Sequence, residues 1–325
     1  MPNVPINFAC GLYDRMLALY TGEVKPEGID LTYTIEENPR AIFDRMGGSL
    51  AFDACEMSTS EFATRYAAQQ CPLVAIPVFP SRIFRHGYII INRRSGIRHP
   101  KDLEGKRVGV PLYTVSALVY MRGMLQHEYG VDLSKIHWVQ GDMHSPKPVH
   151  GNPAVMPLVK PVAIEANTSG KSLNDLLEAN EIGAVMAAFL PPSFGRNPDV
   201  VRLFPDYRAV EEAYYKKTGI FPIMHLVAIR RDLYERHPFV AASLYQAFCR
   251  SRELALQRLL GRGATAAMLP WLNSDAQKMV EFFDGNLWPY GIEPNRKTLE
   301  AFVAYLAEQA MIAAPMPIEE LFVPV

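Results

Sequence analysis

The chain has 325 residues, of which 49% are hydrophobic, and its formal net charge is −1. A chain of this length and apolar content is too long for one small core and predicts two lobes of ordinary size. The near-zero charge lacks the basic surplus of a nucleic-acid-binding protein, and no apolar run reaches the roughly 18 residues of a membrane-spanning helix. We therefore expect neither nucleic acid nor a membrane as a partner.

The N-terminus and the cysteines predict a cytoplasmic protein. Residues 1–15 contain no basic segment followed by a long apolar one, so they do not resemble a secretory signal. The four cysteines form no C-x-x-C pair, and each stands among apolar residues. We interpret them as reduced thiols of the core.

Strand and helix patterns alternate through the first part of the chain. Period-two alternation or short apolar runs predict strands at residues 4–10, 29–37, 71–79 and 87–92. Another strand is predicted to pass into a helix at Ser58–Glu61, where a hydroxyl N-cap and an early glutamate match the chemistry of a helix start.

The same alternation continues in the second part. Residues 99–130 predict a short helix, a strand, a turn and an amphipathic helix, and residues 221–260 predict a strand followed by a long helix. Between them, residues 142–170 contain five prolines. A connection this long and proline-rich is uncommon inside a compact domain and is often functional.

These elements predict an α/β protein with largely parallel sheets. We expect a first lobe over residues 1–95, a second over 96–218, and a return to the first lobe with C-terminal helices over 219–325. Ligands of open α/β sheets bind beyond the carboxyl ends of the strands. The candidate ligand-binding residues at such ends are Arg15, Ser58, Thr59, Arg82, Arg85, His86, Tyr113, Thr114 and Ser116.

A basic trio, Arg82, Arg85 and His86, stands directly before a run of strand formers. A guanidinium presents a planar fork that matches a carboxylate, so this trio predicts a site for two carboxylates, or for one carboxylate and an acidic hydroxyl. The alternative is that the arginines pair with surface acids, which would contribute little to stability.

The two predicted helix starts, near Ser58 and near Ser116, also suit an anion. The first backbone N–H groups of a helix are free and carry the positive end of its dipole. Thr59 and Thr114 add hydroxyl groups. No glycine-rich phosphate motif is present, so these turns favour a carboxylate over a nucleotide, and the alternative is a plain N-cap.

Two histidines outside the basic trio are candidates for chemistry. His225 interrupts an apolar run; such a histidine is more often a hydrogen-bonded core residue, but the expected crossover between lobes lies there, and histidine suits proton transfer near neutral pH. His144, in the proline-rich segment, would close over a ligand or remain solvated. We expect no cofactor, and a divalent metal bound by Glu56, Asp142 and His144 is the alternative.

Three stretches resemble the 4,5-dihydroxyphthalate decarboxylase family of bacterial phthalate breakdown: "GLYDRMLALYTGEVKPEGIDL", "SRIFRHGYIIINRRSGI", and the segment from Arg202 to Phe248, in which "TGIFPIMH" is the most specific part. The strand–turn–helix units, the excursion and return of the chain, and the helical C-terminal region resemble the type II periplasmic-binding-protein fold. In "NEIGAVMAA", Gly183 stands where relatives carry an acid.

The resemblance implies a lyase on a two-lobed binding-protein scaffold, whose partner is a small aromatic dicarboxylate and which forms a homo-oligomer. It implies that His225 or His86 donates a proton to the ring, that Arg82 and Arg85 anchor the remaining carboxylate, and that Arg15, Ser58, Thr59, Tyr113, Thr114, Ser116 and His144 make further contacts. The alternative is a solute-binding protein for an aromatic carboxylate that performs no chemistry.

Overall fold

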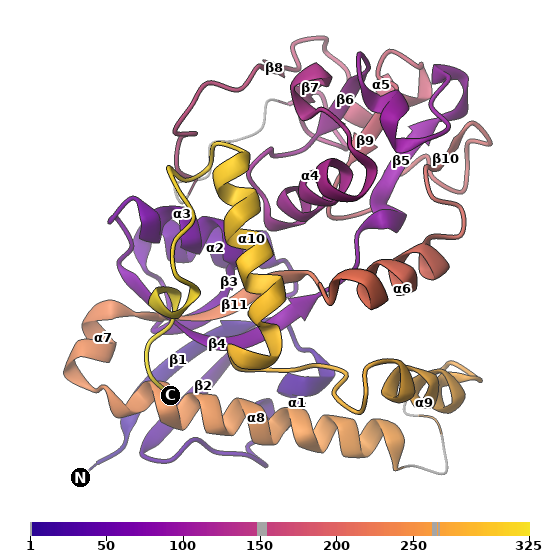
Figure 1. Cartoon of the computed structure of the whole chain (residues 1–325). Coiled ribbons are helices and arrows are strands. Elements are labelled where there is room, and N and C mark those ends of the chain that lie inside the picture. The colour runs from indigo at the N-terminus through magenta and orange to yellow at the C-terminus, as the bar shows by residue number, and fades with distance from the viewer. Residues whose placement is uncertain (1, 148–154, 262–264, 266) are drawn as a thin grey trace.

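The chain folds into two lobes, each built around its own sheet (Figure 1). The structure, a computed structural model, describes residues 2–147, 155–261, 265 and 267–325. The first sheet has five strands in the order β2-β1-β3-β11-β4, and the second has six in the order β10-β5-β9-β6-β7-β8. The predicted two-lobed α/β class is confirmed.

The first sheet is parallel except for one strand. Its strands are β1 (Val4–Cys10), β2 (Ile29–Ile35), β3 (Ala54–Ser58), β4 (Leu73–Arg82) and β11 (Ile223–Arg230). β11 lies antiparallel between β3 and β4, so its beginning meets the carboxyl ends of its neighbours. Its register shifts twice against β4, on either side of His225. Such irregularities re-aim side chains and are common beside functional sites.

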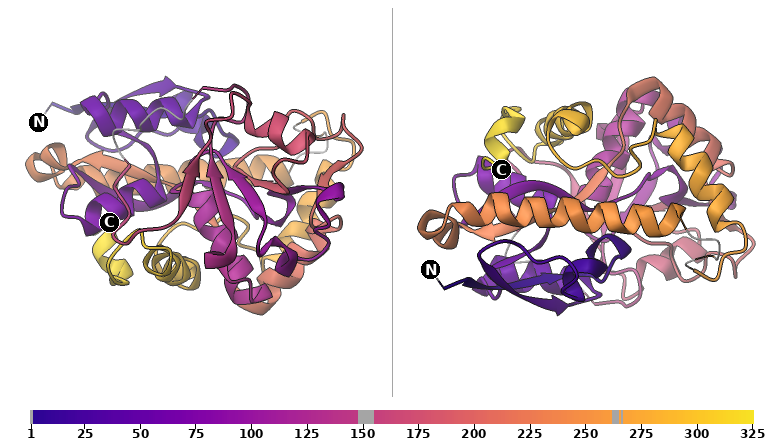
Figure 2. Two further views of the ribbon diagram at one scale, coloured as in Figure 1. Left: turned by 90° about the horizontal axis from the view of Figure 1, so that it is seen from above. Right: turned by 90° about the horizontal axis from the view of Figure 1, so that it is seen from below.

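The helices of the first lobe are α1 (Leu17–Tyr20), α2 (Pro39–Ser49) and α3 (Thr59–Ala67). The sequence specifies the ends of α2: the Asn38 side chain accepts from the Arg40 amide, Pro39 occupies the first turn, and Leu50 ends the helix in the left-handed region. The long helix α8 (Phe239–Leu260) runs along the first sheet and packs Phe248 against Phe8, with the rings 5.2 Å apart (Figures 1 and 2).

The second lobe is a mixed sheet with helices around it. Its strands are β5 (Ile89–Asn92), β6 (Arg107–Val110), β7 (His137–Gln140), β8 (Ile164–Ala166), β9 (Ala184–Met186) and β10 (Val200–Arg202). The helices of this part are α4 (Ser116–Tyr129), α5 (Leu173–Glu178) and α6 (Tyr207–Thr218). β5 is antiparallel to both β9 and β10, whereas β6, β7, β8 and β9 are parallel.

The C-terminal part comprises α7 (Arg231–Arg236), α8, α9 (Leu272–Phe282) and α10 (Arg296–Glu308). α10 packs against α4 of the second lobe, where Phe302 stacks on Tyr120 with ring centroids 5.0 Å apart. A Cβ at Gly123 would lie 2.3 Å from the Tyr305 ring, so only glycine permits this approach. Short 3-10 turns lie at Asp14–Met16, His86–Tyr88, Arg93–Ser95, Pro100–Leu103, Leu133–Lys135, Glu293–Asn295 and Ile318–Leu321.

The chain passes between the sheets twice, and the two crossovers lie side by side. The Ile83 amide of the first donates to the Pro222 carbonyl of the second. β5 pairs within the second sheet, so the first crossover comes before Ile89 rather than at the expected boundary near residue 95. α10, one of the expected C-terminal helices, packs on α4 of the second lobe.

Two further predictions concern the proline-rich segment and the membrane. Residues 148–154 lie outside the described residues, and the rest of 142–163 contains neither helix nor strand. In the described part of the chain no helix has the length and apolar character needed to cross a membrane.

Candidate functional site

A glutamate and a histidine meet where strands of the first sheet end. His225 of β11 is the cross-strand partner of Ser58 in β3, and Glu56 precedes Ser58 by two residues. Since side chains alternate along a strand, Glu56 and Ser58 point to the same face. The Nδ1 atom of His225 lies 2.5 Å from Oε1 of Glu56. Sheet pairing therefore joins two residues that are 169 positions apart.

The Glu56 carboxylate is fully buried and surrounded by donors. Besides His225, it accepts from the Tyr13 hydroxyl at 2.9 Å, the Cys10 thiol at 3.2 Å and the Gly11 amide at 3.3 Å. Burial alone would raise the pKa of Glu56, but the His225 charge and these hydrogen bonds outweigh it and hold the pKa below its ordinary value. We call these five residues the Glu56–His225 cluster, and its carboxylate is ionised.

His225 is the member of the cluster that a ligand can reach. Its side chain is 18% exposed, whereas that of Glu56 is 0% exposed. Because Nδ1 faces the carboxylate, Nε2 is the ring nitrogen left to exchange a proton with a ligand. The Phe43 ring of α2 packs edge-on against the imidazole at 4.9 Å. A carboxylate that orients a partly exposed imidazole is an arrangement suited to general acid–base chemistry.

Next to this cluster, three serines join the two lobes. The Ser58 hydroxyl lies 3.2 Å from that of Ser60 and 3.3 Å from that of Ser116. The Ser116 hydroxyl accepts from the Ser60 amide at 2.9 Å, so a residue of the second lobe caps α3. Ser58 was expected to cap this helix with its own hydroxyl and does not. This serine cluster brings the N-termini of α3 and α4 together.

Two threonines stand beside these helix starts with unused hydroxyls. Thr59 is 1% exposed and Thr114 is 9% exposed. Neither Oγ1 atom has a hydrogen-bond partner among the described residues. A buried hydroxyl without a partner is costly, so both hydroxyls have unused hydrogen-bonding capacity at this junction.

Arg15 supports the Glu56–His225 cluster by packing against the Tyr13 ring. Its guanidinium lies between the rings of Tyr13 and Trp288, 4.2 and 4.4 Å from their centroids. Its Nε donates to the Pro80 carbonyl at 2.7 Å. Arg15 therefore fixes the Tyr13 ring, whose hydroxyl binds Glu56, and the structure does not show it directed at a ligand.

The two arginines of the basic trio bind backbone carbonyls near the crossovers. Arg82 donates to the carbonyls of Phe221, at 2.8 Å, and Pro289, at 3.2 Å. Arg85 donates to the Ala188 carbonyl of the second lobe at 3.0 Å and to the sulfur of Met224. Burial lowers the pKa of Arg82 to about 9 and that of Arg85 to about 10, so both stay charged at neutral pH. The arginines tie the crossovers together rather than standing free for two carboxylates.

His86 lies apart from His225 in a sealed environment. It is 1% exposed, and neither ring nitrogen has a hydrogen-bond partner among the described residues. The rings of Tyr129, Phe204 and Tyr214 surround it. Burial lowers the pKa of His86 to about 4, so the ring is neutral at pH 7. A neutral, enclosed imidazole is a poor proton donor.

The remaining predicted residues lie in the second lobe. The Tyr113 ring is buried beneath the Arg122 guanidinium, 3.6 Å from its centroid. His144 stacks on Phe189 at 5.5 Å, and Asp142 accepts hydrogen bonds from the amides of His144 and Ser145. Tyr113 therefore supports the turn before α4, while His144 and Asp142 form a local turn.

The suggested metal ligands are not assembled into a metal site. Glu56 is engaged by His225 and Tyr13, and Asp142 by its own turn. Among the described residues no group of three or more His, Cys, Asp or Glu has a geometry that would hold a metal ion.

Two curated proteins are similar to this chain in sequence. A curated 4,5-dihydroxyphthalate decarboxylase of Comamonas testosteroni is 34% identical over 325 residues, which cover 100% of this chain and 98% of that protein. A second, of Pseudomonas putida, is 33% identical over 217 residues, or 66% of this chain and 83% of that protein.

The chain belongs to the 4,5-dihydroxyphthalate decarboxylase family. The family model described as NMT1/THI5 like also matches residues 21–187, which include β3, α3 and α4 of the site. β11, which carries His225, lies outside that match.

Solved structures support the fold of this decarboxylase-family chain. The periplasmic aliphatic sulphonate binding protein of Escherichia coli superposes with a TM-score of 0.52 at 10% identity, over 99% of this chain and 98% of that one. A putative periplasmic sulfonate-binding protein of Methylobacillus flagellatus gives a TM-score of 0.51 at 11% identity, over 100% and 93% of the two chains. At such identities the likeness shows the binding-protein fold alone.

Gly183, which stands where relatives carry an acid, lies away from the Glu56–His225 cluster. Gly183 precedes β9, whereas the carboxyl end of β9 leads to Ala188, which Arg85 contacts. A Cβ at Gly183 would come within 3.0 Å of the Ile97 side chain. The glycine is therefore explained by close packing at the far end of the strand.

Sequence reasoning missed several members of the site. Glu56 was considered only as a metal ligand, and Cys10 only as a core thiol. Arg40 was not considered and Glu61 only as part of a predicted helix start, yet they form a bidentate ion pair beside Phe43, with contacts of 2.6 and 2.9 Å. The available signal was a glutamate inside the predicted strand "ACEMS", between the apolar residues Cys55 and Met57, since a buried acid needs partners.

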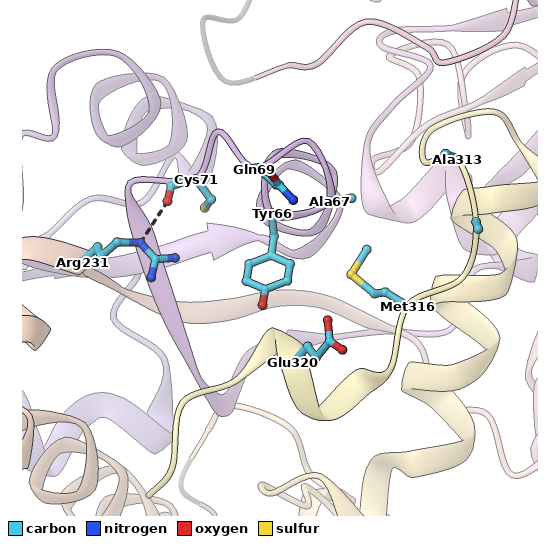
Figure 3. Close-up of a pocket in the computed structure, with 9 residues that line it drawn as sticks. Tyr66, Ala67, Gln69, Cys71, Arg231, Ala313, Met316 and Glu320 are labelled. Carbon is cyan, nitrogen blue, oxygen red and sulfur yellow. Dashed lines mark hydrogen bonds between the residues drawn. The ribbon is translucent and has the colours of Figure 1, made fainter.

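A separate surface pocket of about 570 Å³ lies between the end of α3 and the C-terminal segment (Figure 3). It is lined by Tyr66, Cys71, Arg231, Met316 and Glu320, among others. None of its lining residues belongs to the Glu56–His225 cluster, and its arginine donates to the Cys71 carbonyl. We therefore place the functional site at the strand ends and not in this pocket.

Proposed function

We propose that this protein removes one carboxylate of 4,5-dihydroxyphthalate as CO2 and forms 3,4-dihydroxybenzoate. The observation that carries the proposal is the pairing of a buried, ionised Glu56 with a partly exposed His225. The likeness to the curated decarboxylase of Comamonas testosteroni over the whole chain supports the same chemistry. His225, which the sequence analysis named together with His86, is the proton donor in this proposal.

The reaction needs one proton and a ring rich in electrons. His225 Nε2 donates a proton to the ring carbon that bears the leaving carboxylate, and Glu56 stabilises the imidazolium before transfer. The hydroxyl para to that carbon gives its proton to solvent water, and its electron pair moves through the ring to form the new C–H bond. The C–CO2 bond then breaks, and its electrons restore the aromatic ring. The phenolate oxygen and His225 each take a proton back from solvent. One positioned acid contributes about 10²–10⁴-fold to such a step.

The carboxylate that stays on the ring is proposed to bind at the serine cluster. Ser58 is the cross-strand neighbour of His225, and opposite residues of antiparallel strands lie about 5 Å apart. The N-termini of α3 and α4 meet there, and their dipoles favour an anion. The hydroxyls of Thr59 and Thr114 add donors without other partners among the described residues.

The test is turnover. Purified protein is incubated with 4,5-dihydroxyphthalate, with and without a chelator, while CO2 release and 3,4-dihydroxybenzoate are followed. We expect both products in equal amounts and the same rate in chelator. Saturable binding without product would contradict the proposal and favour a solute-binding role. A rate abolished by chelator and restored by a divalent cation would contradict the cofactor-free mechanism.

We also propose that the protein is cytoplasmic and forms a homo-oligomer. The four cysteines are free thiols, which supports a reducing, cytoplasmic location. A homo-oligomer is proposed from the family resemblance, and light scattering of the purified protein would test it.

A further inference from the structure

Arg122 is a fully buried charge with an incomplete set of partners. It lies in α4, is 0% exposed, and is the largest completely buried side chain described. Its Nε donates to Oε1 of Gln309 at 2.8 Å. Nη1 and Nη2 have no hydrogen-bond partner among the described residues. A guanidinium has five N–H donors, so most of this group is unsatisfied by the protein.

The surroundings of Arg122 offer aromatic faces in place of an acid. Its guanidinium lies 3.6 Å from the centroid of Tyr113 and 5.8 Å from that of Trp138. Burial lowers its pKa to about 10, which leaves it charged at neutral pH. Glu308, next to Gln309 in the sequence, binds His127 and Gln126 instead. Within the described part of the chain, Arg122 therefore has no ion-pair partner.

The position of this charge relates it to the proposed substrate site. Side chains on a helix lean toward its N-terminus, and Arg122 reaches back to Tyr113, which stands three residues before Ser116. Ser116 belongs to the serine cluster at the contact between the lobes. By helix geometry, Arg122 is about 9 Å along α4 from Ser116. The cation thus lies behind the N-terminus of α4 and strengthens its positive end.

We propose that Arg122 is a positioning residue whose uncompensated buried charge attracts the dianionic substrate to the N-terminus of α4. The inference rests on the proposed function, because it concerns the same dicarboxylate site. A buried cation is weakly screened by salt, and at about 10 Å with an effective dielectric of about 20 it changes affinity by about tenfold for each negative charge of the ligand. The effect therefore depends on ligand charge, which a merely structural role would not produce.

The test is a charge series of ligands. Phthalate, benzoate and benzamide carry two, one and no negative charges above neutral pH, and none has the ring hydroxyl that the reaction requires. Their binding is measured by calorimetry, so no turnover is needed. For Arg122→Met we expect phthalate to bind about 100-fold and benzoate about tenfold more weakly, with benzamide unchanged.

A second variant neutralises the same charge without removing the arginine. Gln309→Glu places a carboxylate on Nε of Arg122, so it should reproduce the charge-dependent loss even if Arg122→Met does not fold. The controls keep the cation. Arg122→Lys retains the charge, and Gln309→Met loses the hydrogen bonds to Arg122 and to the Val119 carbonyl. Both controls should keep the wild-type ratio of phthalate to benzamide affinity.

The outcomes separate this inference from the proposed function. Equal weakening of all three ligands in Arg122→Met and Gln309→Glu, in a protein that still decarboxylates 4,5-dihydroxyphthalate, would overturn the inference alone. Wild-type protein that neither binds phthalate nor turns over 4,5-dihydroxyphthalate would overturn both. Loss graded by ligand charge in a protein that releases no CO2 would uphold the role of Arg122 in anion binding and overturn the lyase.

Discussion

Two of the histidine–glutamate pairs in the protein, His225–Glu56 and His86–Glu211, differ in almost every physical respect. His225 and Glu56 are 2.5 Å apart, and the carboxylate accepts further hydrogen bonds from Cys10, Gly11 and Tyr13. The His86 imidazole and the Glu211 carboxylate are 3.8 Å apart, and no hydrogen bond joins the ring to the carboxylate, which accepts from the Gly87 amide instead.

The two pairs differ in whether hydrogen-bond donors of the protein compensate for the burial of the charged groups. Donors replace water around Glu56, so it stays ionised although it is fully buried. Near the first crossover, burial dominates: it raises the pKa of Glu211 to about 7 and lowers that of His86 to about 4. Two residue types therefore give a hydrogen-bonded pair with an ionised carboxylate in one place and a pair that favours its neutral forms in another.

The largest expected difference between the two pairs is the loss of kcat when each histidine is replaced. We expect His225→Gln to lower kcat by about 10²–10⁴-fold, because the amide retains a contact to Glu56 but has no proton to donate. His86→Phe is the matched change in the other pair, and it should leave kcat close to that of the wild type. Steady-state kinetics of both variants decides the matter. A large loss in His86→Phe with little loss in His225→Gln would reverse the assignment.

The carboxylates give a smaller but diagnostic effect. Glu56→Gln removes the charge that stabilises the protonated His225 and should reduce kcat by about 10–100-fold, in the range found for residues that orient a functional histidine. The pH–rate profile is the informative measurement, since the alkaline limb, on which a general acid loses its proton, should shift when the carboxylate is lost. Glu211→Gln serves as the control. An unchanged profile in Glu56→Gln would show that the carboxylate only supports the fold.

The smallest expected effect is on stability, and its sign differs between His86 and Glu211. The pKa of Glu211 rises from 4.5 to about 7 on folding, so its contribution is present below pH 4.5 and is lost as the pH rises through 7. The pKa of His86 falls from 6.5 to about 4, so its contribution is present above pH 6.5 and is lost as the pH falls toward 4. Between pH 4.5 and 6.5 the two slopes oppose each other.

Replacing either His86 or Glu211 should reveal how the remaining residue makes the free energy of unfolding depend on pH. In His86→Phe, the free energy of unfolding should fall between pH 4.5 and 7, by up to about 3 kcal/mol. In Glu211→Gln, it should rise between pH 4 and 6.5. Urea unfolding at a series of pH values measures both. Parallel pH profiles in the two variants and the wild type would show that neither group changes its protonation on folding.

Local patterns predicted the elements better than the site. The strand at residues 4–10 and the change from strand to helix at Ser58 follow from alternation and helix-start chemistry, which act over a few residues. The Glu56–His225 bond depends on the pairing of β3 with β11, whose register is set by tertiary packing. No local pattern in either strand contains that register.

The basic trio also shows that a sequence reveals charged residues more readily than their partners in the fold. Its charges were visible in the sequence, and an anion was the natural partner to expect. In the structure Arg82 finds the carbonyls of Phe221 and Pro289, which come from segments 139 and 207 residues away. Backbone carbonyls are present at every residue, so no composition or motif reveals which of them will meet a buried guanidinium.

The packing of α10 on α4 has a consequence for the order in which this protein is made. The Tyr120 hydroxyl donates to the Thr298 carbonyl, across a separation of 178 residues. The ribosome therefore releases the strands of the second lobe long before the helix that covers α4 exists. We expect the nascent chain to expose the α4 surface until α10 emerges, which makes that surface a natural ligand for chaperones that bind apolar segments during synthesis.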